Sequence, residues 1–395
     1  MSLIRFLKKK NSPLMIGKWP ANRLRSDMDI SIDSRTIQPG QYFIPVNSGR
    51  KYIQDAIDKG GRLLDVNLSN YARQYRKKLN CHVIGLTGSS GKTTCKDLLS
   101  SVLGQRFRIQ KTQGNQNNEI GVPLSILRAD HETEILIVEM GMRKKGDIRL
   151  LTQWLQPTHA VITNIGTAHL EFFQSQRHIA YAKAEIFRKQ AYWQKGARVA
   201  FLNTSSPYFE LLADKARHYD YDILPFMGED KPDQNVQLCY QVGRHFGLSE
   251  SQIKDGIDAY QPSENRLDVQ RIGDVTLIND AYNANPDGVE YALTYLKQYQ
   301  GRKIMVLGDM KELGKNTVKI HQSLASLMIE AGVDILMTLG PVSAQINSES
   351  MDVLHYQDQA QLNATLKAEL KEGDIVLVKG SRALKLEETV AYLAS

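Results

Sequence analysis

Residues 85–94 read GLTGSSGKTT, a Gly-rich turn between an apolar segment and a segment with helical spacing. The apolar residues 82–86 predict a short strand, and residues 92–103 predict a helix. In such a turn the backbone N–H groups converge on phosphate oxygens, and the N-terminus of the following helix adds its positive dipole end. The stretch therefore predicts a phosphate-binding loop.

The residue types in this loop suggest how a nucleotide would be held. Lys92 can reach the β- and γ-phosphates, and the Thr93 hydroxyl can bind Mg²⁺. The strict form of the motif has Gly five residues before Gly91, where this chain has Leu86, so the loop is the shorter GxxGKT form. The expected phosphate contacts are Gly88, Ser89, Ser90, Gly91, Lys92, Thr93 and Thr94.

Beyond the loop, strand-like and helix-like segments alternate. Strand-like runs occur at 134–140 (EILIVEM), 160–164 (AVITN) and 198–202 (RVAFL), and helical spacing occurs at 150–155 and 177–190. Residues 220–265 read as a polar, Pro-containing bridge with one helical piece at 250–260. The alternation then restarts, with strands expected at 275–279, 303–307, 335–338 and 375–379 and helices at 288–299, 318–331 and 363–370. Such alternation is typical of a mostly parallel sheet covered by helices.

The region before the loop is shorter and less regular. Residues 29–46 alternate like short strands about a turn at residues 38–40, and residues 53–59 and 70–79 have helical spacing. Because 395 residues exceed one ordinary core, we predict three α/β domains. They are a small N-terminal α/β domain (1–80), a central P-loop-type parallel-sheet domain (81–264) and a C-terminal Rossmann-like α/β domain (265–395).

The net charge of +7 is unevenly distributed, because residues 1–80 hold 16 Lys and Arg against 6 Asp and no Glu. Such a segment could attract nucleic acid, an anionic membrane surface or a phosphorylated small molecule, or it could be a solvated basic face. The sequence shows no zinc finger, RNP-like aromatic pattern or sustained basic helix, which argues against nucleic acid as a partner.

Other bulk features indicate a cytoplasmic protein. No apolar run approaches the roughly 20 residues of a membrane span, and residues 1–10 lack the pattern of a signal peptide. The three cysteines lie far apart without metal-binding or disulfide spacing, which favours a reducing compartment.

Eight further segments, together with the loop, resemble the Mur ligase family. They are TQGNQNNEIGVPLSIL (112–127), IVEMGMRKKGDI (137–148), ITNIGTAHLEFF (162–173), AYAKAEIF (180–187), NRLDV (265–269), NDAYNANPDG (279–288), VLGDMKELG (306–314) and VLVKGSRALKLEE (376–388). The last three favour the branch that joins D-alanyl-D-alanine to a UDP-N-acetylmuramoyl-tripeptide. The resemblance implies a cytoplasmic, monomeric, ATP- and Mg²⁺-dependent ligase of peptidoglycan precursor synthesis that forms an acyl phosphate.

The resemblance also implies a metal and catalytic set in the central domain. Glu139 resembles the family's Mg²⁺ ligand, with Thr93 beside it, and His169 matches the motif for a second Mg²⁺. Lys183 matches a lysine that CO₂ converts to a carbamate, which helps to hold Mg²⁺. Without the resemblance, Glu139 would be read as a capping or salt-bridged residue, His169 as solvated and Lys183 as an exposed helical lysine. The expected catalytic residues are Lys92, Glu139, His169 and Lys183.

Further contacts follow from the resemblance in all three domains. Arg266 is expected at the nucleotide phosphates, Asn283 and Asn285 at the adenine, and Asp309 at the ribose, although Asn-rich NPD segments are usually turns. The expected contacts to the carrier and the amine substrate are Ser34, Arg35, Asn115, Asn118, Lys379, Ser381 and Arg382.

Some features leave other functions open. NSGRKYIQDA (47–56) lacks the histidine that the family usually has in its first domain, and GGRLLDV (60–66) is a shortened strand region. A ligase with a different carrier or amino donor, either folylpolyglutamate-like or from secondary metabolism, is the first alternative. A non-ligase P-loop protein and a non-catalytic Mur-like binding partner are the others. A GTPase would need an Asn-Lys dipeptide to read guanine, and this chain contains none.

Overall fold

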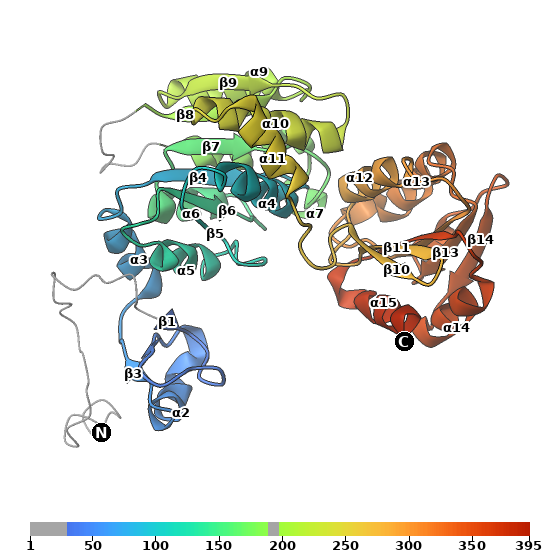
Figure 1. Ribbon diagram of the computed structural model, residues 1–395, viewed down its shortest axis with the longest axis horizontal. Coiled ribbons are helices and arrows are strands. Elements are labelled where there is room, and N and C mark those ends of the chain that lie inside the picture. Colours follow the sequence, from blue (N-terminus) through green and yellow to red (C-terminus); the bar gives the residue numbers. More distant parts are fainter. Residues whose placement is uncertain (1–29, 189–196) are drawn as a thin grey trace.

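The structure, a computed structural model, describes residues 30–188 and 197–395. Within these ranges three β-sheets follow one another along the chain, each with its own helices (Figure 1). We call the three regions the N-terminal, central and C-terminal parts. Residues 1–10, which were expected not to form a signal peptide, fall outside the described ranges. Residues 189–190, the last two of the helix expected at 177–190, fall outside them as well. No helix within those ranges is long and apolar enough to cross a membrane.

The N-terminal part contains a sheet whose three strands have two residues each. Its elements are β1 (Ile30–Ser31), β2 (Tyr42–Phe43), η2 (Asn47–Tyr52), α2 (Ile53–Asp58), β3 (Arg62–Leu63) and α3 (Leu68–Arg76). The two strands expected about the turn are present, but they run parallel. Because parallel strands cannot form a hairpin, the turn does not close one between them. At the turn, the Gly40 N–H donates to the Gly60 carbonyl at 2.8 Å.

The central part is a six-stranded parallel sheet in the order β5-β6-β4-β7-β8-β9. The strands are β4 (His82–Thr87), β5 (Ile109–Lys111), β6 (Ile135–Glu139), β7 (His159–Ile162), β8 (Val199–Asn203) and β9 (Asp222–Phe226). The helices are α4 (Lys92–Leu103), α5 (Gly121–Arg128), α6 (Asp147–Leu155), α7 (Leu170–Phe173), α8 (Gln176–Lys183), η3 (Ala184–Phe187), α9 (Phe209–His218), α10 (Lys231–His245) and α11 (Glu250–Asp258).

Two predictions for this part were wrong. Residues 220–265 are not a bridge with one helix, because they contain β9 and the 15-residue helix α10 before α11. β9 is a partly exposed edge strand containing Pro225, and Pro232 lies in the first turn of α10, where it is tolerated. The helix expected at 177–190 is also shorter, because α8 ends at Lys183 and continues as the 3₁₀ turn η3.

The C-terminal part is a six-stranded sheet in the order β10-β11-β15-β12-β13-β14, antiparallel only between β10 and β11. The strands are β10 (Asp268–Ile272), β11 (Val275–Asp280), β12 (Lys303–Gly308), β13 (Ile335–Leu339), β14 (Asp352–Tyr356) and β15 (Ile375–Lys379). The helices are α12 (Pro286–Leu296), η4 (Gly314–Asn316), α13 (Thr317–Glu330), η5 (Ser343–Gln345), α14 (Gln359–Glu369), η6 (Arg382–Leu384) and α15 (Glu387–Ala394).

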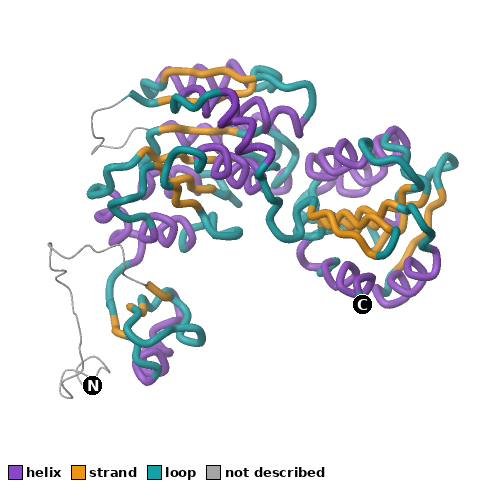
Figure 2. The backbone as a smooth tube through the Cα atoms, viewed as in Figure 1, coloured by secondary structure: helices purple, strands orange, loops and turns teal. Residues whose placement is uncertain are grey.

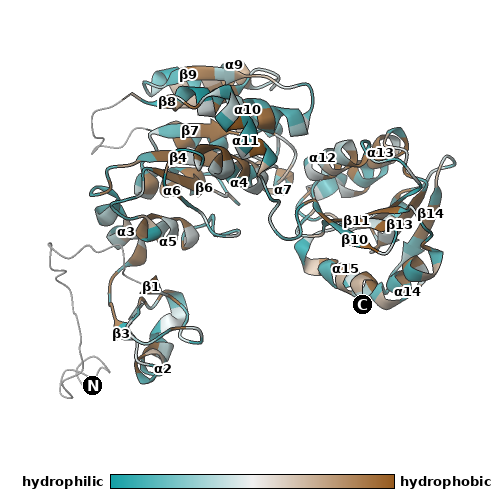
Figure 3. Cartoon of the chain, viewed as in Figure 1, coloured by the Kyte–Doolittle hydropathy of each residue, from teal (hydrophilic) through white to brown (hydrophobic). Residues whose placement is uncertain are grey.

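Both large sheets are buried between two helix layers, and Figure 3 shows apolar strands inside more polar helices. In the central part, α4, α10 and α11 pack on one face, and α5, α6, α8 and α9 on the other. In the C-terminal part, α12 and α13 cover one face, and α14 and α15 the other. This layering confirms the predicted α/β class with three sheet-containing parts.

The strand order places the phosphate loop at a topological switch point. The chain leaves β4 between two groups of strands, β5 and β6 on one side and β7 to β9 on the other. Open α/β sheets bind ligands outside the carboxyl ends of their strands at such a point. The chain then enters the C-terminal part through the loop after α11 (Figure 2). The domain boundaries at 80/81 and 264/265 fall before β4 and within this loop, and they stay predictions.

Candidate functional site

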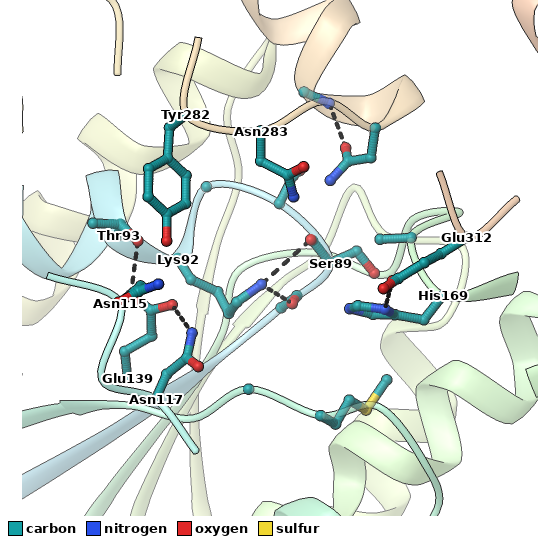
Figure 4. Close-up of a pocket in the computed structure, with 18 of the residues that line it drawn as sticks. Ser89, Lys92, Thr93, Asn115, Asn117, Glu139, His169, Tyr282, Asn283 and Glu312 are labelled. Atoms are coloured by element: carbon teal, nitrogen blue, oxygen red, sulfur yellow. Dashed lines mark hydrogen bonds and ion pairs between the residues drawn. The ribbon is translucent and has the colours of Figure 1, made fainter. Parts of the chain in front are cut away.

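A cavity of about 930 Å³ lies between the central and C-terminal parts. The phosphate loop, the end of β6 and residues Ala168 and His169 before α7 line one side, and the ends of β11 and β15 line the other. The expected site residues that line it are Gly88, Ser89, Ser90, Gly91, Lys92, Thr93, Thr94, Asn115, Asn118, Glu139, His169, Lys183, Arg266, Asn283, Asn285, Lys379, Ser381 and Arg382. Figure 4 shows part of this lining around Lys92.

The phosphate loop occupies the turn between β4 and α4. Gly91 precedes α4 with a φ of 72°, in the left-handed region that favours glycine. Lys92 Nζ donates to the carbonyl oxygens of Gly88 at 2.9 Å and Ser89 at 3.4 Å (Figure 4). Burial lowers the pKa of Lys92, and this effect outweighs the Glu139 carboxylate, which raises it. The ammonium group is thus held at the loop where a phosphate would accept its hydrogen bonds.

Asn164, just after β7, holds the phosphate loop in place. Its side-chain oxygen accepts from the N–H groups of Ser89 and Ser90, both at 3.0 Å, and its amide nitrogen donates to Ser90 Oγ at 2.7 Å. Asn164 was not among the expected site residues. Its position at the end of an expected strand was the available signal, because the carboxyl ends of parallel strands meet at one edge of the sheet.

Glu139 ends β6 with 2% of its surface exposed. Its Oε2 accepts from the Thr93 hydroxyl at 2.8 Å, and its Oε1 accepts from the Asn117 amide at 2.7 Å (Figure 4). Asn117 also lines the cavity and was not expected from the sequence, which favoured its neighbours Asn115 and Asn118. The two hydrogen bonds fix the direction of a buried carboxylate beside the loop.

The donor groups beside the loop fit a magnesium ion. Mg²⁺ in proteins takes oxygen ligands and is usually held by one or two carboxylates together with substrate phosphates and waters. The Glu139 carboxylate and the Thr93 hydroxyl, 2.8 Å apart, provide two such oxygens. Among the described residues, no three His, Cys, Asp or Glu side chains gather closely enough to hold a metal by themselves. A magnesium ion here would therefore also take ligands from phosphate and water.

Lys183, the last residue of α8, is 1% exposed and lines the cavity. The reading as an exposed helical lysine is therefore wrong. Burial is the main cause that holds the pKa of Lys183 well below its usual range, the positive charge of Lys92 lowers it further, and Asp287 opposes both. The environment favours a neutral amine at this position.

His169 contacts a residue of the C-terminal part. Its Nδ1 lies 2.6 Å from Oε2 of Glu312, at hydrogen-bonding distance (Figure 4). Because an ionised carboxylate only accepts hydrogen bonds, Nδ1 carries the proton and Nε2 keeps its lone pair in the neutral ring. Burial first, then the charges of Lys183 and Lys92, lower the pKa of His169, which favours this neutral form.

The loop after β11 has both a structural and a cavity-lining role. Asn285 is the N-cap of α12 and accepts from the Gly288 N–H at 2.8 Å, and it also lines the cavity. Asn283 is exposed at the cavity, and the Arg266 guanidinium lies 4.0 Å from the centre of the Tyr282 ring. These side chains form the wall opposite the phosphate loop.

The end of β15 adds basic groups to the same wall. Lys379 is 4% exposed, forms an ion pair with Asp280 and donates to the Asn283 carbonyl at 3.1 Å. The Ser381 hydroxyl is buried and has no hydrogen-bond partner. Arg382 pairs with Glu387 at 2.7 Å but is exposed at the cavity. An unpaired hydroxyl beside an exposed guanidinium suits the binding of a carboxylate.

Three expected site residues lie elsewhere. Asp309 does not line the cavity, because its carboxylate accepts from the N–H groups of Val342 and Ser343 after β13. Ser34 and Arg35 belong to the N-terminal part, where Arg35 forms an exposed ion pair with Asp33. The expectation that Asp309 contacts the ribose stays a prediction.

Comparison with known families and proteins is consistent with this geometry. Residues 86–267 match the Mur ligase middle domain, and residues 265–382 match the Mur ligase glutamate ligase domain. The chain is 30% identical to the UDP-N-acetylmuramoyl-tripeptide–D-alanyl-D-alanine ligase of Bacillus subtilis, covering 92% of each chain. It is 28% identical to the Escherichia coli ligase of the same name, covering 92% of this chain and 93% of the relative.

Solved structures of similar proteins extend the likeness to the whole fold. MurF from Acinetobacter baumannii has a TM-score of 0.83 at 25% identity over 93% of each chain. MurF from Thermotoga maritima, solved in complex with ADP, has a TM-score of 0.80 at 26% identity over 93% of this chain and 97% of that one. The matches extend over both large sheets and the cavity between them, and the chain belongs to the Mur ligase family.

Proposed function

We propose that this chain is an ATP-dependent, ADP-forming ligase that joins D-alanyl-D-alanine to a UDP-N-acetylmuramoyl-tripeptide in peptidoglycan precursor synthesis. The supporting observation is the cavity itself, which places a phosphate loop opposite the basic wall formed by Lys379 and Arg382. The names of the relatives state this reaction. We further propose that the protein acts as a monomer in the cytoplasm.

The first step is phosphoryl transfer from ATP to the substrate carboxylate. A carboxylate oxygen attacks the γ-phosphorus, the bond to the β–γ bridging oxygen breaks, and ADP leaves. Lys92 turns from the loop carbonyls to the β- and γ-phosphates, where its charge offsets the negative charge of the transferred group. Thr93 and Glu139 would hold Mg²⁺, which neutralises phosphate charge when bound. His169 Nε2 is a further candidate ligand.

The second step forms the amide. The amine nitrogen of D-alanyl-D-alanine attacks the carbonyl carbon of the acyl phosphate, inorganic phosphate leaves, and the nitrogen loses one proton. We assign Lys379, Ser381 and Arg382 to the carboxylate of the amine substrate, since an exposed guanidinium and an unpaired hydroxyl can orient it. We assign Arg266, Asn283 and Asn285 to the nucleotide, and Ser34, Arg35, Asn115 and Asn118 to the carrier substrate.

We propose that Lys183 is carbamylated. The lone pair of its neutral amine attacks the carbon of CO₂ and forms an N–C bond, and the nitrogen then releases one proton, so a buried neutral amine becomes a carbamate anion. The support is the burial of Lys183 and its lowered pKa, because an ammonium group cannot attack CO₂. The resulting carboxylate would lie in the cavity near Lys92 and could direct Mg²⁺.

A ligase with another carrier or amino donor is the second candidate. It is favoured by the N-terminal part, whose strands have two residues each and whose sequence lacks the family's usual histidine. A panel of acceptors and amines separates the two candidates through release of inorganic phosphate. We expect turnover only with the UDP-linked tripeptide and D-alanyl-D-alanine together. Turnover with a folate acceptor and glutamate, and none with the first pair, would favour the alternative.

A further inference from the structure

Residues 163–169, which we call the linking segment, run from the end of β7 to α7 and contact the phosphate loop on one side. The Thr163 hydroxyl donates to the Ser90 carbonyl at 2.8 Å. Asn164 accepts from the N–H groups of Ser89 and Ser90, and the Gly166 N–H donates to Ser89 Oγ at 2.9 Å. These contacts connect the linking segment rigidly to the loop.

The other side of the linking segment contacts the C-terminal part through two carboxylates. Oδ2 of Asp287, in the first turn of α12, accepts from the Thr167 N–H at 2.8 Å and from its hydroxyl at 3.3 Å. Oε2 of Glu312, between β12 and η4, accepts from His169 Nδ1 at 2.6 Å. Both carboxylates therefore contact the same seven-residue segment that holds the loop.

The backbone positions of Gly166 and Glu312 allow these two contacts. An added Cβ on Gly166 would overlap the Asp287 carboxylate, so only glycine leaves room for it. The φ of Gly166 is not in the left-handed region, so the space and not the backbone conformation requires glycine. Glu312 has a φ of 64°, a conformation that is unfavourable for a side chain with a Cβ. Its surroundings must hold that conformation in place.

We propose that Asp287 and Glu312 dock the C-terminal part onto the linking segment and so act as positioning residues for ligation. The two carboxylates accept from donors of this segment, the N–H and hydroxyl of Thr167 and the ring N–H of His169. Docking sets Arg382 and Asn283 opposite the phosphate loop, because these residues belong to the same C-terminal part as Asp287. The proposal rests on the proposed function for its consequence, but the docking itself is measurable without turnover.

The test measures the distance between the two parts in the full chain by electron spin resonance between two spin labels. Exposed Glu210 on α9 and Ser326 on α13 are replaced by cysteine for labelling. Cys81 is changed to serine, because it is partly exposed while Cys95 and Cys239 are buried. We expect one main distance in this background, and longer, broader distances after Asp287→Ala or Gly166→Ala.

Conservative variants separate docking from a general loss of structure. Asp287→Asn keeps an oxygen that accepts from Thr167 and should keep the main distance, as should Glu372→Ala, an exposed acidic residue before β15. Glu312→Ala should lengthen the distance and Glu312→Gln should do so less. Unchanged distances in Asp287→Ala and Gly166→Ala, with circular dichroism showing folded protein, would overturn the proposal. Lengthening in Glu372→Ala to the same extent would overturn it as well.

Discussion

Lys92 is the residue on which the nucleotide chemistry depends. In the structure its ammonium group donates to its own loop, and it is the side chain in the loop that brings a full positive charge to the phosphates. We expect Lys92→Ala to lower ATP-dependent phosphate release at least about 100-fold while the fold stays intact. Steady-state kinetics measures the rate of phosphate release, and circular dichroism shows whether the fold is intact. Lys145→Ala, an exposed lysine outside the site, is the matched control. Turnover of Lys92→Ala near the unmodified rate would refute the loop assignment.

Lys183 distinguishes a carbamate from a simple cation. Mutation of a group that orients the ligands of a metal ion typically lowers activity about 10- to 100-fold. We expect the activity of Lys183→Ala to fall by a factor in that range. Acetate at high concentration should restore part of the activity, because a free carboxylate can enter the space of the truncated side chain. Carbon-13 NMR with labelled CO₂ should show a carbamate signal that Lys183→Ala lacks.

Lys183→Arg tests the opposite interpretation. Arginine keeps a positive charge but stays protonated and cannot form the carbamate in the same way. We expect this variant to be as impaired as Lys183→Ala and to gain little from acetate. A fully active Lys183→Arg would show that the cation, and not a carbamate, is what the site needs.

At the scale of elements, strand β7 and helix α10 carry a pair of histidines away from the cavity. His159 is 3% exposed, and its Nε2 lies 3.0 Å from Nε2 of His245. Burial first, then the charges of His245 and His82, lowers the pKa of His159 to about 3. One of the two facing nitrogens donates to the other when both rings are neutral, whereas protonation of His159 would place a positive charge in a buried position beside His245 and His82.

The sign of the pH effect follows from this lowered pKa. The unfolded chain binds a proton at His159 below about pH 6.5, whereas the folded chain binds it only near pH 3. The neutral His159 therefore makes its whole contribution to the free energy of unfolding above pH 6.5, and this contribution is lost as the pH falls. We expect a loss of about 2 kcal/mol between pH 7 and pH 5 from this residue. Urea unfolding at both pH values should show a smaller loss in His159→Phe, since the neighbouring Phe201 and Phe246 can pack against the new ring. An equal loss in both proteins would refute this assignment.

The elements that sequence patterns predicted well are the buried strands and the helices next to them. The phosphate loop, β4 and α4 were predictable because apolar runs, glycines and helical spacing all indicate the same structure. β9 and α10 were missed because an edge strand with mixed burial and a helix with a polar outer face lack a continuous apolar run. Asn164 and Glu312 were missed because their roles depend on contacts between segments far apart in sequence.

At the scale of the whole molecule, the site exists only where two parts meet. The phosphate loop belongs to the central part, whereas Arg266, Lys379 and Arg382 belong to the C-terminal part. In the proposed assignment, the nucleotide and the amine substrate therefore need both parts to come together. This arrangement is typical of enzymes in which domain closure completes the active site and excludes water.

The proposed reaction forms the amide through an acyl phosphate. The direct test supplies UDP-N-acetylmuramoyl-tripeptide labelled with oxygen-18 in its C-terminal carboxylate, together with ATP and D-alanyl-D-alanine, and follows the products by mass spectrometry. We predict ADP, the UDP-linked pentapeptide and inorganic phosphate that carries one oxygen-18 atom from the carboxylate. Label in AMP, or no pentapeptide while ATP is consumed, would contradict the account.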